Sequence, residues 1–131
     1  MFNTVKKKKL LLIDDDEIHL EIAMHMLNED YETISASSGQ NALELFYKGH
    51  VPHLVLLDIV MPNMDGWEVY RRIKAISTLH DIPVAFYTSL TGEEEKKHAK
   101  AIGAADYLIK PFKRDELLER LETILAVNEK A

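Results

Sequence analysis

The sequence predicts an α/β domain whose doubly wound, five-stranded parallel sheet is covered by five helices. Short apolar runs alternate with amphipathic stretches along the chain, and glycine, proline or other turn residues separate them. Strands that alternate with helices in this way form a parallel sheet with helices on both faces. Because crossovers are right-handed, few topologies remain, and we expect the strand order 2-1-3-4-5. The length of 131 residues suits a single domain, 1–131, with a core over about residues 8–127.

The first half of the chain carries three predicted strands and two predicted helices. Acidic residues from Asp14 to Glu17 follow the first apolar run and favour the positive end of a helix dipole. Ser37 and Gln40 have capping-box spacing ahead of the second helix, and Gly49 ends that helix. The predicted elements are a strand over 10–13, a helix over 17–28, a strand over 31–36, a helix up to about 47 and a strand over 53–58.

The second half adds two strands and three helices. Pro83 introduces the fourth strand. Thr91 and Glu94 form a second capping-box pattern ahead of a charged helix, which Gly103 closes. The predicted elements are a helix over 67–76, a strand over 84–88, a helix closed at 103, a strand over 105–109 and a final amphipathic helix.

One apolar run determines where we expect the functional site. Leu54 to Leu57 suit a strand buried on both faces, and Asp58 closes that strand. A carboxylate costs free energy inside a core, so Asp58 should emerge at the carboxyl edge of the sheet, where open α/β sheets bind ligands. Pro62 and Gly66 predict a turn immediately afterwards.

In the expected strand order the first and third strands are neighbours, so Asp14 and Asp15 should lie beside Asp58. Carboxylates within about 4 Å of one another repel by about 1 to 4 kcal/mol per pair. A cation has to balance them unless one is protonated. Oxygen ligands without cysteine or converging histidines favour Mg²⁺, which keeps several waters that a phosphate can replace.

Two further side chains are expected at the same edge. Thr88 closes the fourth strand and Lys110 closes the fifth. The fourth strand is next to the third, so a short hydroxyl can reach Asp58, whereas the fifth is about 10 Å away and requires a long side chain. A carboxylate nucleophile, Mg²⁺, a lysine and a hydroxyl donor suit a phosphoryl-transfer site that forms an aspartyl phosphate.

With these motifs the chain resembles, over nearly its whole length, the flavodoxin-like response-regulator receiver domain of bacterial two-component signalling. The matching motifs are Asp14-Asp15, Asp58 with Met61-Pro62 and Asp65-Gly66, Thr88-Ser89 and Lys110-Pro111-Phe112. The resemblance implies a signalling phosphoacceptor rather than an enzyme acting on free substrates. Its donor would be a phosphohistidine of a sensor histidine kinase or a histidine phosphotransfer protein.

The resemblance also implies a separate role for each of the three acids. Asp58 would accept the phosphoryl group. Asp15, Asp58 and the backbone carbonyl of Val60 would hold Mg²⁺, and Asp14 would help through water. The positions two beyond Asp58 and two beyond Thr88 flank the water that hydrolyses the aspartyl phosphate in the family, and here they are Val60 and Leu90, which cannot orient it by hydrogen bonding.

By the same resemblance, Thr88 and Lys110 would contact the phosphoryl oxygens, and the Lys110-Pro111 bond would be cis. Tyr107 stands where the family has an aromatic switch that moves inward with Thr88. A half-buried strand tyrosine is an equally good interpretation of Tyr107 from sequence.

The first helix predicts a docking surface for the phosphodonor. Helical spacing places Leu20, Ala23, Met24 and Leu27 on the core face. A second apolar stripe falls on the opposite side, and such a stripe is either covered or presented to a partner. Its residues are Ile18, Ile22 and Met26. The downstream target is not readable from sequence, and the receiver resemblance is compatible with a monomer or a phosphorylation-dependent dimer.

Two other classes of protein share parts of this pattern. The stretch from Leu12 to Ile18 mimics the nucleophile motif of haloacid-dehalogenase-like phosphatases, but their second acidic motif is missing after Lys110. A flavodoxin-like cofactor binder would need amide-rich glycine turns after the first strand, where this chain has four acids. Both alternatives are therefore less favoured than a receiver domain.

Composition narrows the possible partners further. The net charge of −6 argues against direct nucleic-acid binding, and no apolar run is long enough to cross a membrane. The absence of cysteine fits a cytoplasmic location. The six histidines are scattered, and we expect them at the surface without a site of their own.

Overall fold

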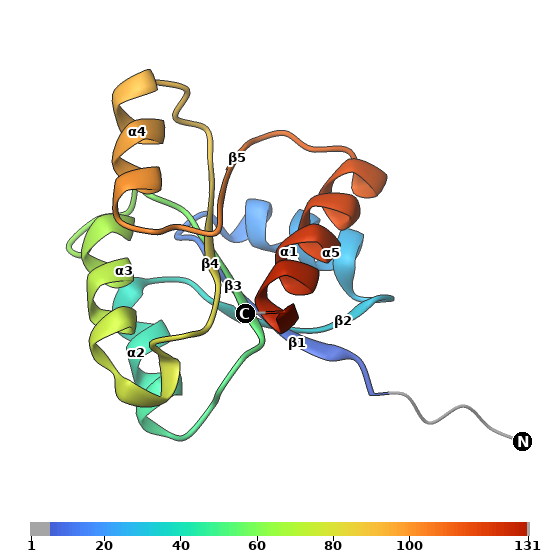
Figure 1. Ribbon diagram of the computed structural model, residues 1–131, viewed down its shortest axis with the longest axis horizontal. Helices are drawn as coiled ribbons and strands as arrows, with labels where there is room; N and C mark the ends of the chain where they lie inside the picture. Colours follow the sequence, from blue (N-terminus) through green and yellow to red (C-terminus); the bar gives the residue numbers. More distant parts are fainter. Residues whose placement is uncertain (1–5, 131) are drawn as a thin grey trace, which may run out of the picture.

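The fold is a five-stranded parallel sheet between two layers of helices, as the sequence predicts. The computed structural model describes residues 6–130, and Figure 1 shows their arrangement. The elements are β1 (Lys8–Ile13), α1 (Glu17–Leu27), β2 (Tyr31–Ala36), α2 (Gly39–Tyr47), β3 (Leu54–Leu57), α3 (Gly66–Ala75), the short 3₁₀ helix η1 (Ser77–Leu79), β4 (Val84–Thr88), α4 (Glu93–Ala101), β5 (Asp106–Ile109) and α5 (Arg114–Lys130).

The strand order β2-β1-β3-β4-β5 confirms the predicted topology, and each pairing is parallel. After β1 the chain places β2 on one side and then adds β3, β4 and β5 on the other. The carboxyl ends of β1 and β3 are level with each other, because Ile13 pairs with Leu57. The residues that follow these two strands therefore meet at one edge of the sheet.

The central strands bury side chains on both faces. In β1, Leu11 and Ile13 pack into the core beneath α2, α3 and α4, whereas Leu10 and Leu12 pack into the core beneath α1 and α5. Figure 1 shows these two groups of helices on opposite sides of the sheet. Each fully buried leucine contributes about 1.5 to 3 kcal/mol relative to an exposed one, so the strand ends that carry the polar residues are firmly held.

The start of α2 differs from the sequence prediction by one residue. Its N-cap is Ser38, whose hydroxyl accepts a hydrogen bond from the backbone N–H of Asn41 at 3.0 Å. The predicted pairing of Ser37 with Gln40 is wrong, because the Ser37 hydroxyl accepts instead from the side-chain amide of Asn41. Two adjacent serines made the register of the cap ambiguous.

The predicted capping box of Thr91 and Glu94 is also wrong. The N-cap of α4 is Gly92, which has no side-chain hydrogen bond to offer, and the helix begins at Glu93. Three glutamates, Glu93 to Glu95, occupy its first turn and interact favourably with the helix dipole. Among the strands, β1 begins two residues earlier than predicted, at Lys8, and β3 is one residue shorter at each end, Leu54–Leu57. Within residues 6–130 no helix combines the length and apolar character that a membrane span requires.

Candidate functional site

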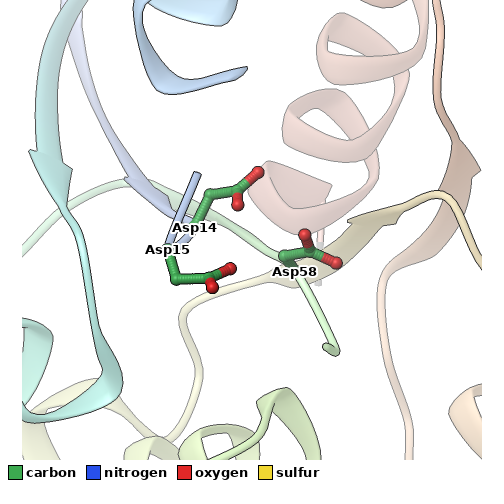
Figure 2. Close-up of side chains that lie close together, drawn as sticks. All are labelled: Asp14, Asp15 and Asp58. Atoms are coloured by element: carbon green, nitrogen blue, oxygen red, sulfur yellow. The ribbon is translucent and has the colours of Figure 1, made fainter. Parts of the chain in front are cut away.

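Three carboxylates meet at the carboxyl edge of the sheet, between β1 and β3. Asp14 and Asp15 follow β1 directly, and Asp58 follows β3. Two backbone hydrogen bonds extend the strand pairing into this edge, from the N–H of Asp58 to the carbonyl of Ile13 at 2.9 Å and from the N–H of Asp14 to the carbonyl of Ala36 at 3.1 Å. One oxygen from each of the three carboxylates lies within 4.8 Å of the others. Figure 2 shows the three side chains gathered at this edge.

The turn after β3 fixes the side chain of Asp58. The N–H of Ile59 donates a hydrogen bond to Asp58 Oδ1 at 2.7 Å, and the N–H of Gly66 closes the turn on the carbonyl of Ile59 at 2.8 Å. A Cβ atom on Gly66 would lie 2.2 Å from the carbonyl oxygen of Asp58, closer than any real contact. Gly66 is therefore required so that α3 can begin directly against the strand that carries Asp58.

Lys110 reaches the acids from the far side of β4. Its N–H donates to the carbonyl of Thr88 at 2.8 Å, and its ammonium donates to Asp14 Oδ2 and, at 3.3 Å, to Asp58 Oδ2. The same ammonium lies 5.3 Å from the centre of the Tyr87 ring, a cation–π distance. The Lys110-Pro111 peptide bond is cis, as the resemblance implies. The lysine thus has the reach that its position on the fifth strand requires.

The site holds an excess of negative charge. Burial raises the pKa of Asp14, and the Asp58 carboxylate adds to the rise, while the hydrogen bond from Lys110 opposes it. Burial alone would lower the pKa of Lys110, but its hydrogen bonds and ion pairs with Asp14 and Asp58 outweigh that effect and raise it. Both pKa shifts favour the protonated form, that of Asp14 mainly through burial and that of Lys110 through its contacts with Asp14 and Asp58. Oxygen ligands with surplus negative charge fit a hard divalent cation such as Mg²⁺.

Thr88 and Tyr107 lie on neighbouring strands and are linked through Leu90. Thr88 is fully buried, and its hydroxyl accepts a hydrogen bond from the N–H of Leu90 at 3.3 Å. The hydroxyl of Tyr107 donates to the carbonyl oxygen of Leu90 at 2.9 Å. Leu57, which precedes Asp58, pairs with Phe86, so Thr88 lies two residues further along the adjacent strand.

The predicted docking residues do not share one environment. Ile18 and Ile22 are 68% and 54% exposed, as an open apolar stripe requires. Met26 is partly buried and packs against the core between the sheet, α1 and α5, so it is less open than Ile18 and Ile22, and its docking role stays a prediction. Arg114 of α5 donates a hydrogen bond to the Met26 carbonyl at 3.1 Å. Val60, near the acids, is 58% exposed.

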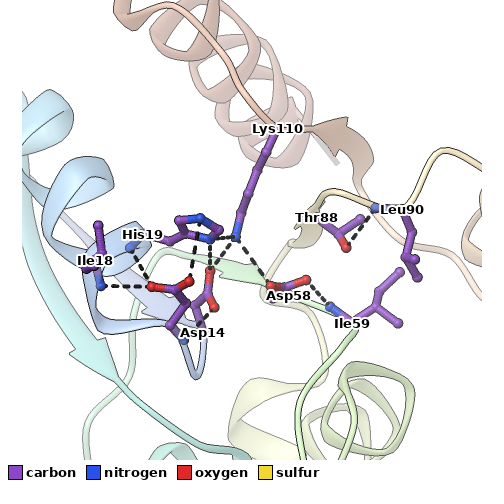
Figure 3. A network of polar contacts seen from close by, with 9 residues as sticks. Asp14, Ile18, His19, Asp58, Ile59, Thr88, Leu90 and Lys110 are labelled. Carbon is purple, nitrogen blue, oxygen red and sulfur yellow. Dashed lines mark hydrogen bonds and ion pairs between the residues drawn. The ribbon is translucent and has the colours of Figure 1, made fainter.

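His19 is the residue that sequence analysis missed. It was grouped with scattered surface histidines, yet its Nδ1 lies 3.2 Å from the Lys110 ammonium and 3.8 Å from Asp14 Oδ2. Its Nε2 lies 3.6 Å from Asp16 Oδ2. Figure 3 shows the ring above the acids, on the first turn of α1. The sequence did contain a clue to this position. His19 lies in the first turn of the helix that follows Asp14 and Asp15, so it lies at the same edge of the sheet as those acids.

Fold, acids and lysine together define a receiver domain, and comparison with known proteins agrees. The family model of the response regulator receiver domain matches residues 10–122, so the chain belongs to this family, and its setting is two-component signalling. The family match thereby favours a response regulator over the two alternatives considered from sequence, a haloacid-dehalogenase-like phosphatase and a flavodoxin-like cofactor binder.

Individual relatives fall into two groups. The chain is 37% identical over 126 residues to the "Probable transcriptional regulator ycf27" of Galdieria sulphuraria, covering 95% of this chain and 48% of that protein. It is 34% identical to the "Chemotaxis protein CheY" of Halobacterium salinarum, covering 90% and 97%. The solved structure of the Vibrio cholerae chemotaxis protein CheY4 is 30% identical, with a TM-score of 0.83, covering 90% and 98%. The chain spans about half the length of the ycf27 regulators and nearly all of the chemotaxis proteins.

Proposed function

We propose that the chain, 1–131, acts as one receiver domain that accepts a phosphoryl group on Asp58 from a phosphohistidine donor. In the transfer, the phosphorus–nitrogen bond of the donor breaks as a phosphorus–oxygen bond forms to the Asp58 carboxylate, and the departing imidazole takes up a proton. The protein assists its own phosphorylation and its later hydrolysis, and it turns over no free substrate.

The observation that supports this proposal most strongly is the environment of Asp58, whose carboxylate lies beside those of Asp14 and Asp15 and faces the Lys110 ammonium. Its Oδ1 is engaged by the N–H of Ile59, and its Oδ2 faces the Lys110 ammonium. Oδ1 and Oδ2 are therefore held in a fixed orientation at the sheet edge, and the ammonium stands where charge develops on a transferring phosphoryl group. With Asp58 largely buried, competing water is limited.

Mg²⁺ fits the three carboxylates gathered at this edge. Asp15, Asp58 and the backbone carbonyl of Val60 would hold it, and Asp14 would help through water. The ion would supply charge neutralisation, which would let an anionic phosphodonor approach the carboxylates. Lys110 and the Thr88 hydroxyl then bind phosphoryl oxygens. To bind a phosphoryl oxygen, the Thr88 hydroxyl would rotate away from the N–H of Leu90. Tyr107 would then move with Leu90, because its hydroxyl donates a hydrogen bond to the Leu90 carbonyl.

The proposed protein partner is the helical surface of a sensor histidine kinase or of a histidine phosphotransfer protein. Ile18 and Ile22 are exposed on α1, and spaced apolar anchors on a helix suit docking against another helix. The downstream target differs between the two groups of relatives, one of transcriptional regulators and one of chemotaxis proteins. A change of interaction surface on phosphorylation would be the common output.

The decisive experiment is incubation with acetyl phosphate and Mg²⁺, followed by intact mass measurement. We expect one added phosphoryl group in wild type and none in Asp58→Asn or in excess chelator. Asp81→Asn is the matched control, because Asp81 is fully exposed and lies outside the site. Undiminished labelling of Asp58→Asn would refute the assignment. Hydrolysis of a generic phosphoester with turnover would favour a phosphatase instead.

A further inference from the structure

The Lys110 ammonium has three N–H donors, and three side-chain acceptors surround it. Two are carboxylate oxygens, Asp14 Oδ2 and Asp58 Oδ2. The third is the ring nitrogen Nδ1 of His19, at 3.2 Å, and Figure 3 shows it on the α1 side of the ammonium. The receiver chemistry proposed above assigns no part to this imidazole.

The contact restricts the form of the imidazole ring. Nδ1 accepts from Lys110 only in the neutral tautomer that carries its hydrogen on Nε2, so the contact fits that tautomer. An imidazolium would place a second cation 3.2 Å from the ammonium, an arrangement that like-charge repulsion disfavours. Nε2 faces Asp16 Oδ2 at 3.6 Å, and a carboxylate is an acceptor, which favours a hydrogen on that nitrogen.

Asp16 is itself held in place by the start of α1. It is the N-cap residue, and its Oδ1 accepts hydrogen bonds from the N–H groups of Ile18 at 3.0 Å and His19 at 3.2 Å. The other carboxylate oxygen is thereby turned toward the His19 ring. A continuous series of contacts runs from the helix cap through the imidazole to the ammonium that faces Asp58.

We propose that His19 is a positioning residue for Lys110 and that Asp16 selects the tautomer that makes this possible. The inference rests on the proposed function, since positioning matters only if Lys110 stabilises a transferring phosphoryl group. By occupying the third N–H, His19 holds the ammonium between Asp14 and Asp58 before the phosphodonor arrives. A donor group fixed in advance stabilises developing charge without reorganisation during the transfer.

The first test reads the tautomer directly and needs no phosphorylation. Long-range proton–nitrogen NMR at about pH 8, where a free imidazole is neutral, distinguishes a protonated Nε2 from a protonated Nδ1. We expect the His19 ring of wild type to carry its proton on Nε2. In Asp16→Asn the N-cap is retained, because asparagine caps helices equally well, but its amide nitrogen replaces Oδ2 and donates to Nε2. We expect this variant to carry a smaller share of the tautomer protonated on Nε2 than wild type does, because only the contact with Lys110 then favours it. A wild-type ring protonated on Nδ1, or an unchanged share in Asp16→Asn, would overturn the proposal.

The second test measures the rate of labelling by acetyl phosphate with Mg²⁺. His19→Leu removes the acceptor and is expected to slow labelling roughly 2- to 10-fold, the effect of one lost hydrogen bond. His19→Asn restores an acceptor, since its amide oxygen occupies the place of Nδ1, and should recover at least half of the wild-type rate. His25→Leu on the same helix, exposed and remote from the acids, is the matched control and should keep the wild-type rate.

The two proposals fail in different ways. If wild type is not labelled at Asp58, the proposed function fails, and the NMR measurement still decides whether His19 accepts from Lys110. If wild type is labelled but His19→Leu reacts at the same rate, the positioning role is refuted. Equal slowing in His19→Leu and His19→Asn also refutes it, because a merely structural role would not distinguish an acceptor from a hydrocarbon.

Discussion

Tyr107 and Thr88 hold Leu90 from two sides. The Tyr107 hydroxyl donates to the Leu90 carbonyl, and the Thr88 hydroxyl accepts from the Leu90 N–H. A rotation of the Thr88 hydroxyl toward Asp58 therefore releases one side of a residue whose other side is tied to Tyr107. This shared residue gives the proposed switch a physical connection that does not depend on direct contact between Thr88 and Tyr107.

The lifetime of the aspartyl phosphate should be long. Val60 is exposed near the acids and Leu90 is partly buried, and neither side chain can orient a hydrolytic water. We expect Val60→Asn or Leu90→Glu to speed dephosphorylation several-fold, measured as loss of the phosphorylated mass after the donor is removed. The Leu90 backbone bonds survive both substitutions. If both variants lose phosphate at the wild-type rate, the role of these positions is refuted.

Docking on α1 should be separable from chemistry at Asp58. Ile22→Asp introduces a charge on the exposed apolar stripe and should slow transfer from the cognate phosphohistidine protein at least several-fold, while labelling by acetyl phosphate stays unchanged. Val127→Asp is the matched control, because Val127 is 66% exposed on α5, away from the stripe. Equal loss in both assays would indicate a folding defect, and no loss in either would remove Ile22 from the interface.

Removal of the Lys110 charge should make stability depend on Mg²⁺. Without the ammonium, Asp14 and Asp58 lose their cationic partner, and we expect Lys110→Met to lower the free energy of unfolding by about 1 to 3 kcal/mol in metal-free buffer. Mg²⁺ should recover much of that loss, since it balances the same carboxylates. Thermal unfolding with and without Mg²⁺ measures both effects. Lys113→Met, at an exposed position, is the control, and a loss unaffected by Mg²⁺ would contradict the prediction.

The free energy of unfolding should fall at alkaline pH because of Tyr31. Burial raises the pKa of the Tyr31 phenol to about 12, and the nearby Glu122 and Asp30 carboxylates add to the rise. Because the unfolded-state pKa is about 10, the stabilising preference for the neutral phenol is complete below pH 10 and is lost as the pH rises to about 12. Relative to Tyr31→Phe, wild type should lose no more than about 3 kcal/mol over this interval. Burial also raises the pKa of Tyr70, Tyr87 and Tyr107, so ultraviolet titration should show one fewer late-ionising tyrosine in the variant than in wild type. Ionisation of Tyr31 near pH 10 would contradict the prediction.

Periodicity and strand-end chemistry predicted the fold and the main cluster, for physical reasons that can be named. The four-residue apolar runs of β1 and β3 can only be buried on both faces, and a parallel sheet brings Asp14 and Asp58 to one edge. The length of a lysine side chain then predicted that Lys110 reaches them. The burial of β1 and β3 and the reach of Lys110 could be predicted because both follow from the spacing of residues along the sequence.

The missed features depend on contacts between distant segments. Helical spacing places Met26 on the open stripe of α1, whereas its partial burial against the core shared by α1 and α5 depends on segments far apart in the sequence. His19 was missed because its role depends on the position of the Lys110 ammonium, 91 residues away. The caps at Ser38 and Gly92 were misplaced because short polar segments offer several registers of similar free energy.

The strand order has a consequence for how the molecule is assembled. β3 joins β1 on the side away from β2, and β4 and β5 then each join the outer side of the strand before them, so this part of the sheet follows the order in which the chain is synthesised. Within this order, β1 and β3 bring Asp14 and Asp58 to one edge of the sheet, and β5 supplies the Lys110 ammonium that pairs with both carboxylates. Completion of the charge cluster therefore favours addition of the final strand, and the residues proposed to receive the signal also favour closure of the fold.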